Sequence, residues 1–442
     1  MRMLRRRSTS TPRRRGLPGK IGRTVAAAVI LLLAFIGSLH LTRGTAVRHV
    51  RGVGLGGDPV EVTAPAFLTN ITMLTGAVVS DGHRVELALN GDGTYERLWA
   101  DLASAERSIT LQIYYGNSGR MAGRLRDILV DRARQGVQVL VLYDAFGTSA
   151  ISDEFVTVLR DAGVLIEPFR PLEWSTLHLV QNRSHVRGVV VDGRVGWTGG
   201  FGIDDKWLGD GVTNASWRET NIRFEGPAVR QLQAAFAVAW AEATGVLLTP
   251  PTPPAELVHG VQAGLLYTSP TLGSTAAERF VMLSIAAARR TLYITTAYFA
   301  PDAALVALLS RAAARGVDVR ILTAGPATDM HIVRLAGRSW YERLLEAGVH
   351  LYEWQPTTLH PKTFVVDGVW STVGSINLDN RSLALNDEAT LMVYDPELGR
   401  QMNEVFAADL RHSREITLDA FRQRSWWQRL QESVAWMFTR LL

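Results

Sequence analysis

The sequence predicts an α/β fold of two similar lobes, each a mostly parallel sheet flanked by helices, with the active site between them. Two stretches of the chain repeat one order of helices and strands, at matched positions 183, 180 and 185 residues apart. Short apolar strands alternate with helices in each copy, and the second and third helices end at glycine, as helix C-termini favour. Such a duplication indicates lobes related by a pseudo-twofold axis.

The elements of the two copies correspond in order along the chain. In the first copy, each of three helices leads into a strand: helix 95–107 into strand 109–115, a helix ending at Gly136 into 137–142, and one ending at Gly163 into 164–168. In the second copy the same pairs are helix 277–290 with strand 292–298, a helix ending at Gly316 with 317–322, and one ending at Gly348 with 349–353.

The division of the chain follows from this repeat and from composition. A proline-rich stretch, 249–254, marks the seam between the copies. We expect the following parts: a basic tail at 1–23, a transmembrane helix at 24–41, a linker at 42–82, a first lobe at 83–248, an inter-lobe linker at 249–262, a second lobe at 263–418 and an amphipathic helix at 419–442.

The net charge of +5 is a property of the tail and not of the body. Residues 1–51 hold twelve Arg and Lys and no acidic residue, so the remaining 35 basic residues face 42 acidic ones. An acidic body argues against a nucleic-acid-binding surface. The absence of cysteine excludes disulfides, thiolate nucleophiles and cysteine-ligated metals.

The N-terminal region has the pattern of a membrane anchor. Nine basic residues precede residues 24–41, which contain no Asp, Glu, Lys or Arg and are rich in Ala, Val, Ile and Leu. The alternative is a cleaved signal peptide, although no small-residue cleavage site follows the apolar run. The charge asymmetry predicts a single span in the cell membrane with the N-terminus inside and the catalytic body outside.

The C-terminal region predicts a second membrane contact. Apolar residues recur at helical spacing between 425 and 442, with Arg429, Glu432 and Arg440 between them. The alternative is a helix packed on the body. Trp426, Trp427 and Trp436 favour the interfacial interpretation, because tryptophan prefers the headgroup layer.

One pattern of polar residues occurs at the same place in each copy. In the second, His360 and Lys362 are two apart on a strand, so both side chains point to one face, and Asp367 lies beyond the strand. Ser375, Asn377 and Glu388 follow. The first copy has the corresponding residues His185, Arg187, Asp192 and Glu219.

The spacing His-x-Lys-x4-Asp, with the later Ser, Asn and Glu, resembles the phospholipase D superfamily. Four segments are similar more narrowly to bacterial cardiolipin synthases: 217–220, 225–229, 298–302 and 374–382. The resemblance extends from about Val85 to the C-terminus. It implies a phosphatidyltransferase that forms a phosphohistidine and transfers the group to a glycerol hydroxyl of a second phospholipid.

Roles for the residues follow from phosphodiester chemistry and from this resemblance. Lys362 and Arg187 would clamp the anionic oxygens, with Asn377 and Ser375 completing the donor set. The resemblance makes His185 the nucleophile and His360 the acid and base, an order that the sequence alone does not fix. Two pairs complete the site, Glu219 and Glu388 orienting the opposite lobe's histidines and Asp192 and Asp367 bracing the lobes.

The expected partners are phospholipids, phosphatidylglycerol above all, and a membrane. No metal or cofactor is expected, because Lys, Arg and amide groups supply the charge neutralisation. The oligomeric state stays open. Of the other histidines, His178, His331 and His350 are expected to serve packing or surface roles, although the loop 325–331 could border the site.

The first copy departs from the family pattern twice. Arg187 stands where lysine is usual, and Gly202 where the synthases usually have asparagine. Arginine can still hold phosphate by two parallel bonds. Three alternatives therefore stay open: a phospholipase D that hydrolyses phospholipids or another phosphodiester, a partly decayed membrane protein, and, least favoured, a nuclease.

Overall fold

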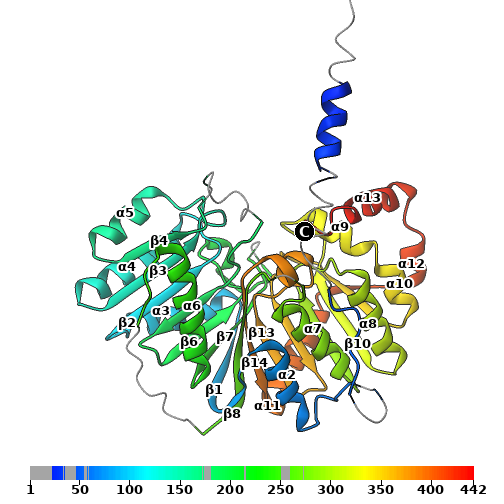
Figure 1. The fold of residues 1–442 in the computed structure, drawn as a ribbon, viewed down its shortest axis with the longest axis horizontal. Helices are drawn as coiled ribbons and strands as arrows, with labels where there is room; N and C mark the ends of the chain where they lie inside the picture. Colours follow the sequence, from blue (N-terminus) through cyan, green and yellow to red (C-terminus); the bar gives the residue numbers. More distant parts are fainter. Residues whose placement is uncertain are drawn as a thin grey trace, which may run out of the picture. The chain divides into compact units, whose positions relative to one another are not determined.

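The computed structural model describes residues 22–32, 34, 46–53, 57, 59–171, 173, 181–213, 216–249, 259–271 and 273–442 (Figure 1). The chain divides into two compact units, residues 1–44 and 45–442. In the first unit, residues 22–32 and 34 are helical and exposed. Among the described residues, no helix is long and apolar enough to cross a membrane. The predicted transmembrane segment 24–41 lies partly, and His178 wholly, outside the described residues.

The described part of the second unit is built on one sheet of fifteen strands, in the order β15-β11-β10-β9-β12-β13-β14-β8-β1-β7-β6-β5-β2-β3-β4. The first lobe supplies β1 (Ser80–Leu89), β2 (Ser108–Ile113), β3 (Gln138–Asp144), β4 (Leu165–Phe169), β5 (Gly188–Val191), β6 (Val195–Gly199) and β7 (Thr220–Glu225). The second supplies β8 (Val261–Thr268), β9 (Thr291–Thr296), β10 (Asp318–Ala324), β11 (His350–Trp354), β12 (Lys362–Val366), β13 (Trp370–Gly374), β14 (Glu388–Tyr394) and β15 (Ser413–Ile416).

The strand order shows the duplication directly. Outward from the centre, the first lobe reads β1-β7-β6-β5-β2-β3-β4 and the second reads β8-β14-β13-β12-β9-β10-β11. The central strands β1 and β8 pair antiparallel, which joins the lobes into one sheet (Figure 1). The α/β fold is confirmed, and the repeated order is consistent with the expected pseudo-twofold relation.

The expectation of mostly parallel sheets needs a correction at the level of strand pairs. Parallel pairing is confined to β2-β3-β4 and β9-β10-β11, and the other neighbouring strands pair antiparallel. The physical reason is the length of the connections, because parallel neighbours need a helical crossover whereas a short turn makes a hairpin. The crossover helices are α4 (Arg120–Arg134), α5 (Asp153–Asp161), α8 (Ala303–Ala314), α9 (His331–Arg338) and α10 (Tyr341–Glu346).

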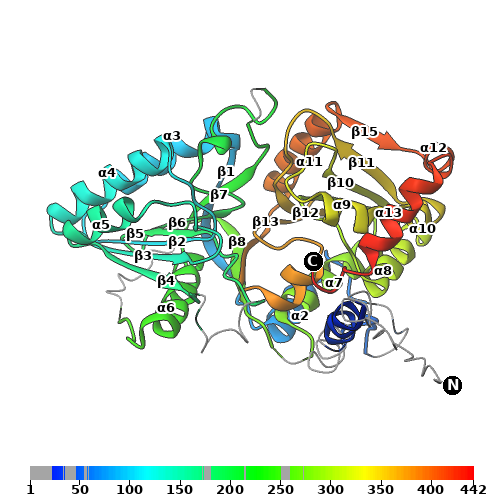
Figure 2. The same ribbon diagram turned by 90° about the horizontal axis from the view of Figure 1, so that it is seen from above.

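Helices cover both faces of the sheet, and the alternation of side chains explains why (Figure 2). On β3, Val139 and Val141 pack in the cluster with α3 (Asn90–Ala103), α4 and α5. Leu140 and Leu142 point the other way, against α6 (Ala228–Thr244). The second lobe repeats this with α7 (Ala276–Ala287) and α8 on one face and α11 (Pro396–Leu410) on the other. Strands buried on both faces read as continuous apolar runs.

The predicted linker 42–82 contains a helix that belongs to the second lobe. Helix α2 (Ala66–Thr75) buries Phe67 and Ile71 in the core cluster formed around α7. The Phe67 ring meets the Trp370 ring edge-on, with 5.1 Å between centroids. The linker prediction is wrong for this helix, because a short apolar segment that packs far along the chain has no signal in local composition.

The predicted C-terminal helix 419–442 is two shorter helices. α12 (Leu418–Arg422) is followed by α13 (Trp426–Trp436), which begins at a Ser425 capping box, and turns follow to the chain end. α13 packs on α9 through Ala435. Its buried Glu432 accepts from Arg338 and Arg424 at 3.0 and 2.8 Å. The face of α13 that packs on the rest of the second unit therefore includes a carboxylate.

Candidate active site

The two motif histidines are positioned by backbone contacts between the lobes. The His185 N–H, just before β5, donates to the Asp387 carbonyl at 2.9 Å. The His360 N–H, just before β12, donates to the Arg218 carbonyl at 2.8 Å. Asp387 and Arg218 each precede a motif glutamate, so these bonds bring each histidine beside the glutamate of the opposite lobe.

Each histidine is paired with that glutamate through its ring. His185 Nδ1 lies 2.9 Å from Glu388 Oε2, and His360 Nδ1 lies 2.6 Å from Glu219 Oε2. Both glutamates are fully buried. A carboxylate at Nδ1 favours the tautomer whose Nε2 carries the lone pair, which is the form that attacks phosphorus or accepts a proton.

Two buried cations lie at the same place. Lys362 Nζ is 3.1 Å from His360 Nε2. Arg187 is only 2% exposed, and its Nε and Nη1 have no hydrogen-bond partner among the described residues. Buried N–H donors without an acceptor are costly. An anion bound between the lobes would supply the missing acceptors.

The pKa values at the site respond mainly to burial. Burial, followed by the charges of Arg187 and Lys362, holds the pKa of His185 and of His360 well below 6.5. Burial also lowers the pKa of Lys362 to about 7 and raises that of Glu388 to about 8. The pKa of Glu219 is raised for the same reason. Burial therefore disfavours the charged forms of both histidines and of both glutamates while no anion is bound.

Two tyrosines complete the walls, and sequence reasoning did not place them in the site. The Tyr114 ring is 4.6 Å from the His185 ring and stacks under Arg187 at 5.4 Å. The Tyr298 ring is 6.3 Å from the His360 ring and 5.9 Å from Lys362 Nζ. Each tyrosine follows the first parallel strand of its copy, β2 or β9. A tyrosine at the carboxyl end of such a strand was the available signal.

Asn377 and Ser375 take different positions from the shared role expected of them. The Asn377 Oδ1 accepts from the Tyr298 N–H at 3.3 Å, which leaves its NH₂ end for a ligand. The Ser375 hydroxyl is bonded to the backbone of Ala389 and to Glu388. Ser375 therefore supports the glutamate behind His185.

The two motif aspartates stand at matching hairpin turns. Asp367 begins the turn between β12 and β13, and its carboxylate accepts backbone N–H groups of residues 289–291 at 2.7 to 3.0 Å. Asp192, between β5 and β6, accepts those of residues 106–108 at 2.7 to 2.9 Å. Each carboxylate thus ties a hairpin to the segment that leads into β2 or β9.

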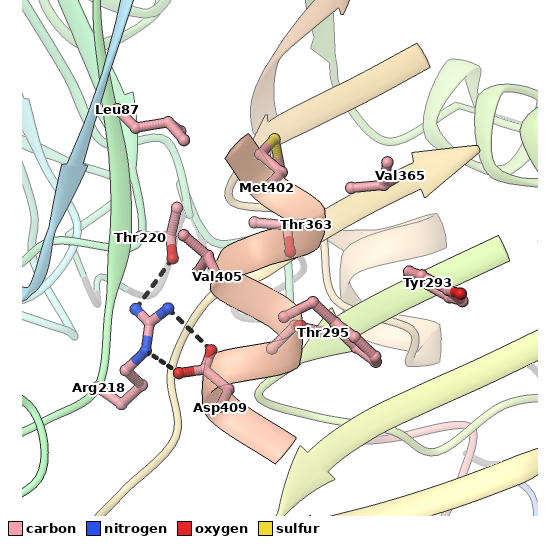
Figure 3. A pocket seen from close by; sticks show the side chains of 11 residues that line it. Leu87, Arg218, Thr220, Tyr293, Thr295, Thr363, Val365, Met402, Val405 and Asp409 are labelled. Atoms are coloured by element: carbon pink, nitrogen blue, oxygen red, sulfur yellow. Dashed lines mark hydrogen bonds and ion pairs between the residues drawn. The ribbon is translucent and has the colours of Figure 1, made fainter. Parts of the chain in front are cut away.

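The seam behind the site is closed. A cavity of about 10 Å³ lies there, lined mainly by residues of β1, β7, β9, β12 and α11. Figure 3 shows the side chains that line it. That volume holds at most one water molecule. At its edge, Arg218 Nε and Nη2 donate to the two Asp409 oxygens at 2.9 and 2.8 Å (Figure 3). This seam joins the lobes and is too small for a substrate.

The chain is similar in sequence to known cardiolipin synthases. Residues 281–410 match the family model described as "Cardiolipin synthase, PLD-like domain". The chain is 36% identical over 370 residues to a cardiolipin synthase of Geobacillus kaustophilus, covering 82% of this chain and 73% of the relative. It is 34% identical over 365 residues to cardiolipin synthase A of Pseudomonas fluorescens, covering 81% and 75%. The chain belongs to the cardiolipin synthase family.

Solved structures show the same fold. A phosphatidylserine synthase of Haemophilus influenzae superposes with a TM-score of 0.61 at 13% identity, over 85% of this chain and 98% of the other. A polyphosphate kinase of Porphyromonas gingivalis gives a TM-score of 0.53 at 14% identity, over 83% and 52%. In the part of this chain that the structure describes, no group of three or more His, Cys, Asp or Glu is placed to hold a metal.

The departure at Gly202 from the cardiolipin synthase pattern has a packing reason. A Cβ on Gly202 would lie 2.7 Å from the Trp207 ring, so an asparagine does not fit there beside the tryptophan. The Trp207 ring in turn lies 5.5 Å from the His360 ring and its Nε1 donates to Glu219 at 3.3 Å. An indole therefore occupies the space beside Gly202 and supports the first-lobe glutamate.

Proposed function

We propose that this chain is a cardiolipin synthase that transfers a phosphatidyl group, through a phosphohistidine, to the glycerol hydroxyl of a second phospholipid. One observation carries the proposal: two buried His–Glu pairs form across the lobes, with the ammonium of Lys362 beside His360 and, near His185, the donors of Arg187 that find no acceptor in the described part of the chain. The sequence relationship to cardiolipin synthases over most of the chain supports the choice of substrate.

The first half of the reaction forms the covalent intermediate. The donor phosphate is held by Arg187, Lys362 and the Asn377 amide, which neutralise the charge that otherwise repels a nucleophile. His185 Nε2 attacks phosphorus while Glu388 stabilises the positive charge that develops on the ring. His360, protonated as the anion binds, gives its proton to the leaving glycerol oxygen.

The second half reverses these roles. His360 Nε2 removes the proton from the acceptor hydroxyl, whose oxygen attacks phosphorus, and the bond from phosphorus to His185 breaks. The short His360–Glu219 distance of 2.6 Å suits a ring that alternates between the neutral and the charged form. Two-lobe symmetry supplies both histidines, so one chain holds the complete set.

The donor and acceptor are proposed to be two molecules of phosphatidylglycerol. The test is lipid analysis of a cardiolipin-deficient bacterium that expresses the intact chain, the His185→Ala variant or the His360→Ala variant. His350→Ala is the matched control, because His350 is half exposed and pairs with Glu415 on the surface. We expect the intact chain and the control variant to restore cardiolipin. Neither His185→Ala nor His360→Ala should restore it. Phosphatidic acid in place of cardiolipin would instead identify a hydrolase. If neither lipid changed, both the synthase and the hydrolase assignment would be refuted.

Membrane attachment is proposed through both ends of the chain, with the body outside the cell membrane. The N-terminal basic and apolar pattern supports an anchor. On α13 and at the residue after it, large apolar side chains are exposed: Trp426, Trp427, Leu430, Val434, Trp436 and Met437, at 44 to 73% exposure. Large exposed apolar side chains grouped on one helix are typical of an interfacial surface.

The two attachments can be separated experimentally. A chain lacking residues 1–44 and its Trp426→Ser/Trp427→Ser derivative would be mixed with phosphatidylglycerol vesicles and floated on a density gradient. We expect the truncated chain to float and the double variant to float markedly less. Equal flotation of the two would contradict a membrane role for α13.

A further inference from the structure

Lys206 is a partly buried cation, its side chain 23% exposed, that takes no part in the proposed phosphatidyl transfer. It lies in the short 3-10 turn η2 (Asp205–Trp207) that follows β6. Three aromatic rings surround its ammonium, with the Tyr115 centroid at 3.8 Å, Trp217 at 3.9 Å and Trp207 at 4.8 Å. The chain has only three lysines and 44 arginines, and Lys206 and Lys362 are the two in the body.

The Lys206 ammonium lacks a hydrogen-bond acceptor within the described residues. Its nearest carboxylate oxygen, Asp204 Oδ2, is 3.9 Å away, beyond hydrogen-bond distance. Burial lowers the pKa of Lys206 to about 8, and the nearby charge of Arg187 acts in the same direction. Aromatic faces stabilise a cation, but they leave its three N–H donors unfilled. The group is thus held ready for an anion.

Lys206 lies on the His360 side of the site. The Trp217 ring that covers it is 5.1 Å from the His360 ring, so the ammonium is at most about 9 Å from that ring. A glycerol bridge between two phosphorus atoms has six bonds of about 1.5 Å and spans roughly 7 Å when extended. A second phosphate one glycerol away from the reacting phosphorus therefore falls within reach of Lys206.

A third cation lies near the two that are proposed to hold the reacting phosphate. Arg187 and Lys362 already match a single phosphodiester. Lys206 adds a third cation from the first lobe, and the nearby carboxylates of Asp204 and Asp329 raise its pKa against the effect of burial. Asp329 also accepts from the Tyr298 hydroxyl at 2.7 Å in the second lobe. Arginine is the usual cation elsewhere in this chain, whereas Lys206 provides a compact ammonium between flat rings.

We propose that Lys206 binds the phosphate of the acceptor lipid and thereby selects an anionic phospholipid, rather than water or free glycerol, as acceptor. This inference rests on the proposed function. His360 takes the proton from the acceptor hydroxyl, the acceptor oxygen bonds to phosphorus, and the phosphorus–His185 bond breaks. Lys206 takes no part in these bond changes and acts as a positioning residue for the rest of the acceptor.

The experiment compares two acceptors for one covalent intermediate. The full-length enzyme in phosphatidylglycerol vesicles is given labelled glycerol, and three products are measured: cardiolipin, labelled phosphatidylglycerol from glycerol exchange, and phosphatidic acid. The ratio of cardiolipin to the other two depends on acceptor choice and not on how fast the intermediate forms. The variants are Lys206→Met, Lys206→Arg and, as a control for loss of a first-lobe charge, the exposed Arg124→Met.

We expect Lys206→Met to lower that ratio about tenfold or more, the effect of losing one charge-assisted contact, while labelled-glycerol exchange stays within about twofold. Lys206→Arg should restore most of the ratio, and Arg124→Met should leave it unchanged. An unchanged ratio in Lys206→Met, or an equal fall of all products, would overturn the inference alone. A wild-type enzyme that makes no cardiolipin would overturn the proposed function and this inference together.

Discussion

At the scale of single residues, the two histidines have unlike supports. Glu388 is held by the side chains of Ser375, Ser382 and Asn386. Glu219 is held instead by Trp207 Nε1 and the Thr220 N–H, and a Cβ on Gly200, the counterpart of Ser375, would lie within 2.6 Å of its Cδ. The first lobe has thus exchanged hydroxyl donors for an indole while keeping the carboxylate at the histidine.

Glu219→Gln and Glu388→Gln should each lower kcat by roughly a hundred- to ten-thousand-fold with little change in KM, because an amide at Nδ1 stabilises neither the tautomer nor the charged ring. Steady-state cardiolipin synthesis measures the effect. Glu415→Gln is the matched control, since Glu415 pairs with the half-exposed His350 on the surface. A fall of less than tenfold in either site variant would contradict an orienting role.

The pH dependence follows from Lys362. With a pKa of about 7, its ammonium is charged below that pH and neutral above it, so the free enzyme loses a phosphate-binding cation as the pH rises. We expect kcat/KM to fall on the alkaline side from about pH 7 to 8, and Lys362→Arg to move that fall to higher pH at a lower maximum, since arginine stays charged. A wild-type profile that is flat up to pH 9 would contradict this.

The sequence predicted the polar residues of the site from their spacing, but it did not predict their partners. The pattern His-x-Lys on a strand places His360 and Lys362 on one face, and the structure has them 3.1 Å apart. Tyr114, Tyr298 and Trp207 were missed, because their positions depend on how the lobes meet. The contacts of Ser375 were also not predicted. They depend on tertiary packing and not on how many residues separate Ser375 from His360 in the sequence.

At the scale of elements, the same Asp-Gly hairpin ends the catalytic strand of each lobe. Asp192 and Asp367 have φ values of 54° and 52°, and Gly193 and Gly368 have 67° and 71°, the left-handed values that the two central residues of such a turn require. These hairpins explain why most strand pairs are antiparallel although the sequence pattern suggested a mostly parallel sheet. Apolar content alone does not distinguish the two arrangements.

Asp367→Ala should cost about 2 to 4 kcal/mol of stability, because it removes three backbone hydrogen bonds to a carboxylate and places alanine at positive φ. Asp367→Asn should cost less, since asparagine tolerates that backbone and keeps one acceptor oxygen. Chemical denaturation measures both. The folded fraction of either variant should keep kcat within about threefold; a hundredfold loss with normal stability would place Asp367 in the chemistry instead.

At the scale of the whole second unit, stability and activity depend on the same seam. The sheet continues through the β1–β8 pair, and each histidine reaches its glutamate only because the lobes are held in register. Two ion pairs flank that register, Arg218 with Asp409 and Arg170 with Asp387, the latter at 2.9 Å. The sequence predicted the two lobes, but it gives no local signal of a contact between two residues that are 191 positions apart.

Asp409→Ala should therefore destabilise the unit as a whole. Removing one partner of a buried ion pair leaves Arg218 uncompensated at 3% exposure, a loss of about 3 to 5 kcal/mol. Arg218→Met/Asp409→Leu should lose less, because no charge is left buried alone. Urea unfolding of the detergent-solubilised chain, followed by tryptophan fluorescence and circular dichroism, should give one transition that shifts as a whole in both variants. Two separate transitions would mean that the lobes fold independently. The ion pairs between the lobes would then form only after the folded lobes associate, and activity would be lost before the first transition ends.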